Sequence, residues 1–479
     1  MKRLVAAFCA LAVVSVAGGK DLAGVYQDAL MYDSQIREAD ATRKASREAN
    51  PQAWAALLPQ LNGNYQISRQ QQQQKSAQAF PDATGALRPF PFNVDSFATN
   101  HGYQLQLSQS IFSYAKWASV ARAHKQVAQA EVDYRAAQEN LVVRVAQAYF
   151  NVLSALDTLD AQAAALEAIS RQLDQANKRF EVGLIAITDV KEAQAARDSA
   201  AAQVIDAKRQ LASNQQALRE ITNQEYESLS KPGDDMPLKA PEPADPERWV
   251  SVSMDQNLSL VSSRLGADVA RDAVEINRGG HFPSVDLTGA KNESHGDVDE
   301  TLSFGGPPGR IQYPQVQNNN SVGLQFTVPI FSGGLVTSQV RQAQYSWIAA
   351  KERVTTVSRQ TEHQARDAYS GVVSEVARVN ALKQGLESAQ TALKATEAGY
   401  EVGTRTAVEV LTSRQNLVQA QTNYAQARYQ YILDIIQLRL AAGTLDGPGV
   451  TEINQWLTAV QAMPTSPVTQ PTPAVPPQP

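Results

Sequence analysis

Two long segments of the chain carry apolar residues at a helical spacing. From Val127 to Leu173 the apolar positions follow one another at intervals of three or four residues, with no glycine or proline between them. This spacing predicts a long helix with a coiled-coil seam that ends near Gly183. A second long helix is expected from about Leu335 to Gly403. The same periodicity predicts shorter helices over about 33–57, 188–222, 254–278 and 406–442.

The helix lengths indicate an unusual architecture. At about 1.5 Å per residue, a helix of roughly 66 residues is about 100 Å long. Helices of roughly 25 and 36 residues placed end to end reach about 92 Å by the same rise. Two short helices can therefore cover the length of one long partner. This arrangement favours a wall of helices over a globular core.

Four other segments alternate between apolar and polar residues, which is the period of a β-strand. They are centred on residues 61–68, 103–108, 285–288 and 322–328. Runs of about 9 to 12 residues suit strands that cross a bilayer at a tilt. An ordinary half-buried antiparallel sheet explains any single run better. All four runs place Gln, Asn, Thr or other polar residues on one face, and this favours a membrane barrel.

The chain also repeats itself at an offset of about 220 residues. Phe180–Gly183 returns as Tyr400–Gly403, and Ile111–Ser113 returns as Ile330–Ser332. The offset changes by only a few residues, where insertions in loops cost little. The period is too long for a solenoid, so two equivalent structural units are expected.

The two ends of the chain lie outside these units. Residues 1–19 begin with the basic residues Lys2 and Arg3, continue with an apolar stretch and end in small residues suited to a cleavage site. This order predicts a secretory signal peptide. Cys9, the one cysteine, lies within it, so no disulfide or thiolate metal site is expected in the mature chain. Residues 463–479 contain seven prolines and no charged side chain, which predicts a disordered tail.

Composition excludes several classes of function. Removal of Lys2 and Arg3 changes the formal charge from −5 to −7, which argues against a nucleic-acid partner. Five histidines show no metal-ligand spacing, and no phosphate loop or nucleophile elbow is present. We therefore expect no enzyme, no cofactor and no metal site.

The predicted division of the chain follows from these patterns. Residues 20–230 form the first structural repeat and residues 254–443 the second, each with a helix, a strand pair, a long helix and a further helix. Residues 231–253 and 444–462 are left as connecting segments. Four strands cannot close a barrel, and open sheet edges are not viable in lipid. Two copies would give eight strands and three copies twelve, and the wider lumen of a trimer is favoured.

The chain resembles the TolC family of outer-membrane channel-tunnels over about residues 21–457. The stretches that carry the resemblance are Arg171–Gln175, Arg179–Phe180, Val182–Leu184, Ala186–Val190, Ser338–Val340, Gln342–Tyr345 and Val402–Thr406. It implies a mainly α-helical fold with a membrane β-barrel: a trimer with a twelve-strand barrel in the outer membrane and a twelve-helix barrel in the periplasm. The connecting segments would form an equatorial belt.

The resemblance also implies a function. Such proteins are passive exit ducts for drug efflux or type I protein secretion. They work with a periplasmic membrane-fusion adaptor and an inner-membrane transporter of the ABC, RND or MFS type. The rival hypothesis is a non-conducting periplasmic tether or adaptor, which would leave the four strands unexplained.

The resemblance finally implies a set of site residues. The helix turns at Gly183 and Gly403 would form a periplasmic tip that is closed at rest. Its latch maps onto Thr188, Asp189, Tyr400 and Arg405, and its constriction onto Glu409 and Thr412, where the family usually has a second acid. The sequence alone offers a simpler role, because Thr406 and Glu409 match a capping box and Asp189 suits a helix start. Both roles can hold together.

Overall fold

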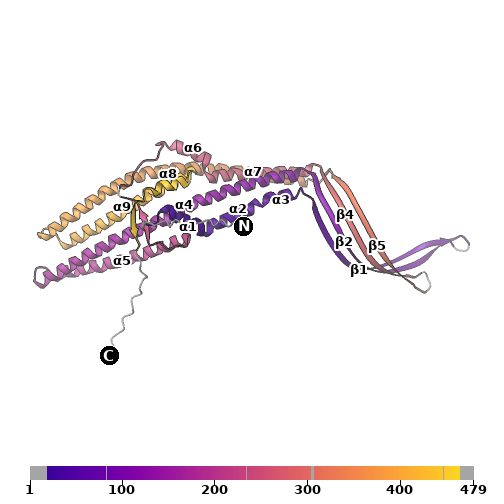
Figure 1. The fold of residues 1–479 in the computed structure, drawn as a ribbon, viewed down its shortest axis with the longest axis horizontal. Helices are drawn as coiled ribbons and strands as arrows, with labels where there is room; N and C mark the ends of the chain where they lie inside the picture. Colours follow the sequence, from indigo (N-terminus) through magenta and orange to yellow (C-terminus); the bar gives the residue numbers. More distant parts are fainter. Residues whose placement is uncertain (1–18, 82–83, 234, 304–306, 446, 464–479) are drawn as a thin grey trace, which may run out of the picture. The chain divides into compact units, whose positions relative to one another are not determined.

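The computed structural model describes residues 19–81, 84–233, 235–303, 307–445 and 447–463 (Figure 1). The predicted signal peptide and Pro-rich tail thus lie almost wholly outside the described residues. The chain forms two compact units. One takes in the described residues up to Lys44, Ala130–Arg264 and Arg353 onward, and the other takes in Ala45–Gln129 and Leu265–Glu352. Both long helices contribute residues to each unit.

The helices agree with the sequence pattern, except that the first long helix begins earlier and that the helices expected over about 33–57 and 254–278 are interrupted at Glu48 and Asn257. The two long helices are α4 (Tyr114–Glu181) and α8 (Leu335–Glu401), and each is followed by a 36-residue helix, α5 (Ile187–Thr222) or α9 (Ala407–Ala442). α4 begins well before Val127, because the residues after β2 continue directly into the helix. The remaining helices are α1 (Leu22–Tyr32), α2 (Ser34–Arg47), α3 (Ala49–Ala55), α6 (Pro246–Gln256), α7 (Leu258–Arg278), η1 (Gly279–His281) and α10 (Gly447–Asn454).

The strands are about twice as long as predicted. β1 (Gln60–Pro81), β2 (Leu87–Ser113), β4 (Ser284–Ser303) and β5 (Gly309–Thr327) form one antiparallel sheet in the order β1-β2-β4-β5. The prediction of 9 to 12 residues was wrong because alternation marks only the strand parts nearest the helices. Beyond them, stretches such as Gln70–Gln74 keep the backbone ladder without any apolar period.

The start of each strand pair has a local cause. Pro59 precedes β1 and Pro283 precedes β4, and proline cannot extend a helix but is tolerated at the start of a strand. The return from strand to helix differs between the two halves. β2 leads into α4 at Tyr114 without a break, whereas Gly333 and Gly334 take φ of +62° and +81° before α8 begins.

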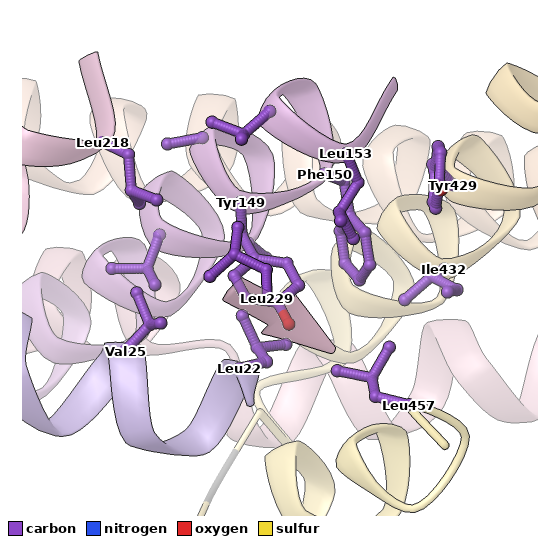
Figure 2. Packing of buried hydrophobic residues seen from close by; sticks show 14 of the residues in the cluster. Leu22, Val25, Tyr149, Phe150, Leu153, Leu218, Leu229, Tyr429, Ile432 and Leu457 are labelled. Atoms are coloured by element: carbon purple, nitrogen blue, oxygen red, sulfur yellow. The ribbon is translucent and has the colours of Figure 1, made fainter. Parts of the chain in front are cut away.

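The first unit has the larger core, built mainly from α4 and α9 together with α1 and the end of α5 (Figure 2). The connecting segments meet here, because β3 (Ser228–Lys231) pairs antiparallel with β6 (Ala459–Ala462). Tyr149 of α4 is fully buried, and its hydroxyl donates to the carbonyl oxygens of Ser230, at 2.5 Å, and Lys20, at 3.1 Å. One side chain thus ties the chain start and β3 to the long helix.

An ion pair between a buried carboxylate and a half-buried arginine fixes the start of α2 against α4. Asp33 is 3% exposed, and its carboxylate accepts two hydrogen bonds from the Arg144 guanidinium, at 2.9 and 3.0 Å. It also accepts the backbone N–H of Ile36 at 2.8 Å, which satisfies the start of α2. Burial alone would raise the pKa of Asp33, but these hydrogen bonds outweigh it and hold the pKa below its ordinary value.

Candidate functional site: the two helical turns

Each long helix ends in a tight turn built around one glycine. After α4, Gly183 has φ of +75°, and the N–H of Leu184 donates to the carbonyl of Arg179 at 2.9 Å. After α8, Gly403 has φ of +79°, and the N–H of Thr404 donates to the carbonyl of Gly399 at 2.8 Å. No neighbouring atom would touch a β-carbon at either glycine, so the left-handed backbone is what requires glycine.

The turn after α8 is held by a capping box, as the sequence predicted. Thr406 is the N-cap of α9, and its hydroxyl accepts the backbone N–H of Glu409 at 3.3 Å. The Glu409 carboxylate accepts the backbone N–H of Thr406 at 2.8 Å. Its other oxygen accepts a hydrogen bond from the Arg405 guanidinium at 3.0 Å. The Thr406 N–H, and then Arg405, hold the pKa of Glu409 below its ordinary value.

The turn after α4 lacks this side-chain cap. The N-cap of α5 is Ala186, which has no polar side chain, and the backbone N–H of Asp189 donates to its carbonyl at 3.2 Å. Thr188 is exposed and Asp189 is half-buried. Asp189 lies in the first helical turn, where a negative charge complements the helix dipole, as expected from the sequence.

The structure places the predicted latch residues on both hairpins of a single chain. Arg405 pairs with Glu409 of its own hairpin, and the Tyr400 ring lies 5.2 Å from the guanidinium of Arg179 on the other hairpin. Among the described residues of one chain, no hydrogen bond joins Thr188 or Asp189 to Tyr400 or Arg405. Any latch between these groups would therefore involve a neighbouring copy or a different side-chain conformation.

The two residues predicted to form a constriction are both near the start of α9. Glu409 is 42% exposed at its side chain, although the capping box and Arg405 occupy both of its oxygens. The exposed Thr412 hydroxyl donates to the carbonyl of Val408 at 2.9 Å. Thr412 therefore adds no charge at this level of the helix.

Sequence reasoning missed the residues that line the groove between the two hairpins. The groove has a volume of about 760 Å³, and its lining includes Arg171, Lys178, Arg179, Glu397 and Arg414. Arg414 forms an ion pair with Glu397, which links α9 to α8. A usable signal existed in α4, because residues spaced seven and eight apart, such as Arg171, Lys178 and Arg179, fall on one face of a helix.

The described residues contain neither a cluster of potential metal ligands nor a helix suited to crossing a membrane. Within the described ranges, no group of three or more His, Cys, Asp or Glu side chains gathers where a metal ion could bind. No helix in the same ranges has both the length and the apolar character that a membrane crossing requires.

The chain is similar to known outer-membrane proteins along most of its length. Residues 25–224 and 249–444 each match the family model described as outer membrane efflux protein. The chain is 34% identical to the outer membrane protein TolC of Vibrio cholerae over 95% of this chain and 99% of that protein. It is 28% identical to the alkaline protease secretion protein AprF of Pseudomonas aeruginosa, over 88% and 84% of the two chains.

A solved structure supports the fold. The outer membrane channel CmeC of Campylobacter jejuni superposes with a TM-score of 0.69 at 20% identity, over 91% of this chain and 89% of that one. This likeness concerns the fold alone. Together with the family model and the identity to TolC, it confirms the resemblance noted in the sequence: the chain belongs to the outer membrane efflux protein family.

Proposed function

We propose that three copies of the chain close a twelve-strand barrel in the outer membrane and form one export channel. As a member of its family the protein is an outer-membrane exit duct. The trimer is supported by the sheet order, which leaves β1 and β5 as the two edges of the four-stranded sheet. Open edges are not viable in lipid, so each sheet needs a partner at both ends.

The face of the sheet that would contact lipid is identified by its exposed apolar side chains. Leu61 and Ile67 of β1 and Leu324 and Phe326 of β5 are each at least 65% exposed in the single chain. Such side chains are stable in a bilayer and costly in water. The polar residues that alternate with them would line an aqueous lumen.

The internal repeat is a further part of the proposal. The two helical hairpins have nearly equal lengths, with 68 and 36 residues in the first and 67 and 36 in the second. The family model also matches the chain twice, once in each half. In a trimer these helices would form a twelve-helix barrel that extends into the periplasm.

The duct would be passive and would depend on partners for energy. We expect a periplasmic membrane-fusion adaptor and an inner-membrane transporter of the ABC, RND or MFS type. The relatives TolC and AprF support outer-membrane location and protease secretion respectively, in the terms of their names. No nucleic acid, cofactor or catalytic step enters this function.

Opening would take place at the two helical turns. Arg405 uses one of its five N–H donors on Glu409, so others are free to reach Thr188 and Asp189 of a neighbouring hairpin. Tyr400 would support the same contact from the end of α8. Threefold symmetry would repeat this latch three times around one aperture, with Glu409 as the constriction.

Purified protein in detergent and planar bilayers tests the proposal. We expect a stable trimer by light scattering and native mass spectrometry, and discrete single-channel conductance after insertion into bilayers. A water-soluble monomer would contradict the barrel. A stable trimer without conductance would instead support the periplasmic tether.

A further inference from the structure

A small aromatic pocket lies between α9 and the connecting segment that follows β3. Its volume is about 340 Å³. Its lining includes three aromatic residues, Trp249, Tyr431 and Trp456, and two prolines, Pro237 and Pro241. All of them belong to the unit that holds the larger core. Hollows of this size with mostly apolar and aromatic walls are typical of ligand sites.

Hydrogen bonds and stacking hold the aromatic rings of the pocket in place. Tyr431 of α9 is 1% exposed, and its hydroxyl donates to the carbonyl of Lys239 at 3.0 Å and accepts the backbone N–H of the same residue at 2.9 Å. The Trp456 ring stacks on Tyr431, with centroids 6.4 Å apart and planes inclined by 23°. The Trp249 indole N–H donates to the carbonyl of Pro243 at 3.0 Å. The pocket is therefore preorganised for a ligand.

The charges and free donors of the lining favour an uncharged ligand that carries carbonyl acceptors. Arg439 and Glu452 form an ion pair with each other, and Lys239 and Glu242 have opposite signs, so the lining has no net charge. The indole N–H of the half-buried Trp456 makes no hydrogen bond to another described residue. Aromatic walls with such donors bind polyproline II segments, whose backbone carbonyls have no internal partner.

The C-terminal segment of the chain has the matching chemistry. Residues 464–479 include seven prolines and no charged side chain, a composition that cannot form a packed core of its own. Pro-rich segments favour the polyproline II helix, which has three residues per turn. Pro473 and Pro476 therefore fall on one edge of such a helix. The same spacing of two prolines occurs in segments that dock in aromatic grooves.

The segment is long enough to return to the pocket. Met463, the last described residue, follows Trp456 by seven residues, so the two are at most about 25 Å apart. A polyproline II segment from Met463 to Pro473 extends about 31 Å. Pro473 and Pro476 can therefore reach the ring of Trp456 on the same chain.

We infer that the C-terminal segment folds back on its own chain and packs Pro473 and Pro476 against Trp249 and Trp456. Because the segment is tethered, its effective concentration at the pocket is on the order of millimolar, and weak contacts suffice. The docked segment would cover the aromatic pocket and tie the connecting segment to α9. The inference does not depend on the number of copies in the channel, since the pocket lies within one unit of one chain.

Photo-cross-linking of the full-length protein in detergent tests this placement. The photoreactive residue p-benzoylphenylalanine at Ala240, an exposed position in the pocket lining, should cross-link to residues 464–479. Mass spectrometry identifies the linked peptide. Pro473→Ala/Pro476→Ala should abolish this cross-link, because it removes both rings from the segment and leaves the pocket unchanged.

Two matched controls use positions close to the same segment. The label at Ile205, exposed on α5, should not cross-link to it, although Met463 is near that helix and accepts a hydrogen bond from Gln215 at 3.3 Å. Pro464→Ala/Pro467→Ala removes two prolines of the same spacing that lie within about 12 Å of Met463 along the chain. This variant should cross-link from Ala240 as the parent does.

Three outcomes overturn the inference. The first is a parent whose label at Ala240 gives no cross-link to residues 464–479. The second is an equal loss of the cross-link in both proline variants, which would show that the contact is not specific. The third is a different occupant: a neighbouring copy, identified by mixing ¹⁴N and ¹⁵N protein, or another protein that is cross-linked in whole cells in place of the segment.

Discussion

The two helical hairpins share one backbone and differ in the side chains of their turns. Gly183 and Gly403 have φ values of +75° and +79°, and the following helices have equal lengths. Yet Ile185 packs against the small apolar cluster of Ala176, Val190 and Ala193, whereas Arg405, at the matching position of the second repeat, is 58% exposed. The shared features are those that a left-handed turn demands.

The second hairpin has more polar groups at its turn than the first. Ala186 corresponds to Thr406, and Asp189 corresponds to Glu409, so the second turn gains a hydroxyl, a guanidinium and a complete capping box. In the first turn, the Asp189 carboxylate takes no part in a capping box. A latch between copies needs a donor on one hairpin and an acceptor on the other, and this asymmetry supplies both.

Removal of the guanidinium should have the largest effect on function. We expect Arg405→Ser to raise single-channel conductance markedly and Arg405→Ser/Tyr400→Phe to raise it further, because in the proposed trimer one substitution would remove all three symmetry-related contacts. The trimer should remain intact. Arg197→Ser, which changes an exposed arginine of α5 paired with Asp198, is the control and should conduct like the parent. If Arg405→Ser also conducts like the parent, the latch assignment is wrong.

Substitution of either turn glycine should have the largest effect on local stability. A residue with a β-carbon in the left-handed region costs about 1–2 kcal/mol, so Gly183→Ala and Gly403→Ala should destabilise their hairpins by similar amounts. Hydrogen exchange of amides near each turn measures this cost. Clearly unequal costs would show that the two turns are not equivalent in backbone strain.

Substitution of the N-cap residues should change the stability of the helix starts by a smaller amount, and with opposite sign in the two hairpins. Thr406→Ala should destabilise the start of α9 by about 1 kcal/mol, since it removes the N-cap oxygen. Ala186→Thr should stabilise the start of α5 by a similar or smaller amount, because Asp189 already lies three residues further on. Hydrogen exchange of the amides in the first helical turns of α5 and α9 measures both changes in stability. A neutral Ala186→Thr would mean that the α5 backbone cannot present the hydroxyl.

The sequence predicted these turns well because each depends on residues close together in the chain. The glycines, the capping box and the helix ends all follow from local rules. The Arg405–Glu409 pair was also accessible, since residues four apart face each other on one side of a helix. Prediction of strand length failed at Gln70–Gln74, because backbone pairing needs no apolar period once a neighbouring strand is present.

Contacts between distant segments were beyond the sequence. The Arg179–Tyr400 contact depends on how two hairpins pack, and the stacking of the His101 and His295 imidazoles depends on the register between β2 and β4. A shift of one residue in that register would place the two imidazoles on opposite faces. No spacing rule within one segment contains this information.

Acid should weaken the turn after α8 by a small but measurable amount. The pKa of Glu409 is below its ordinary value of 4.5, so the folded turn binds fewer protons than the unfolded one near that pH. The contribution of the carboxylate to the turn is therefore complete above about pH 4.5 and is lost as the pH falls through the lowered pKa. Amide exchange at Glu409, corrected for the intrinsic rate, should show this loss. Glu409→Gln is the matched control, because glutamine completes a capping box without titrating in this range. If Glu409→Gln loses protection in acid as the parent does, another group controls the turn.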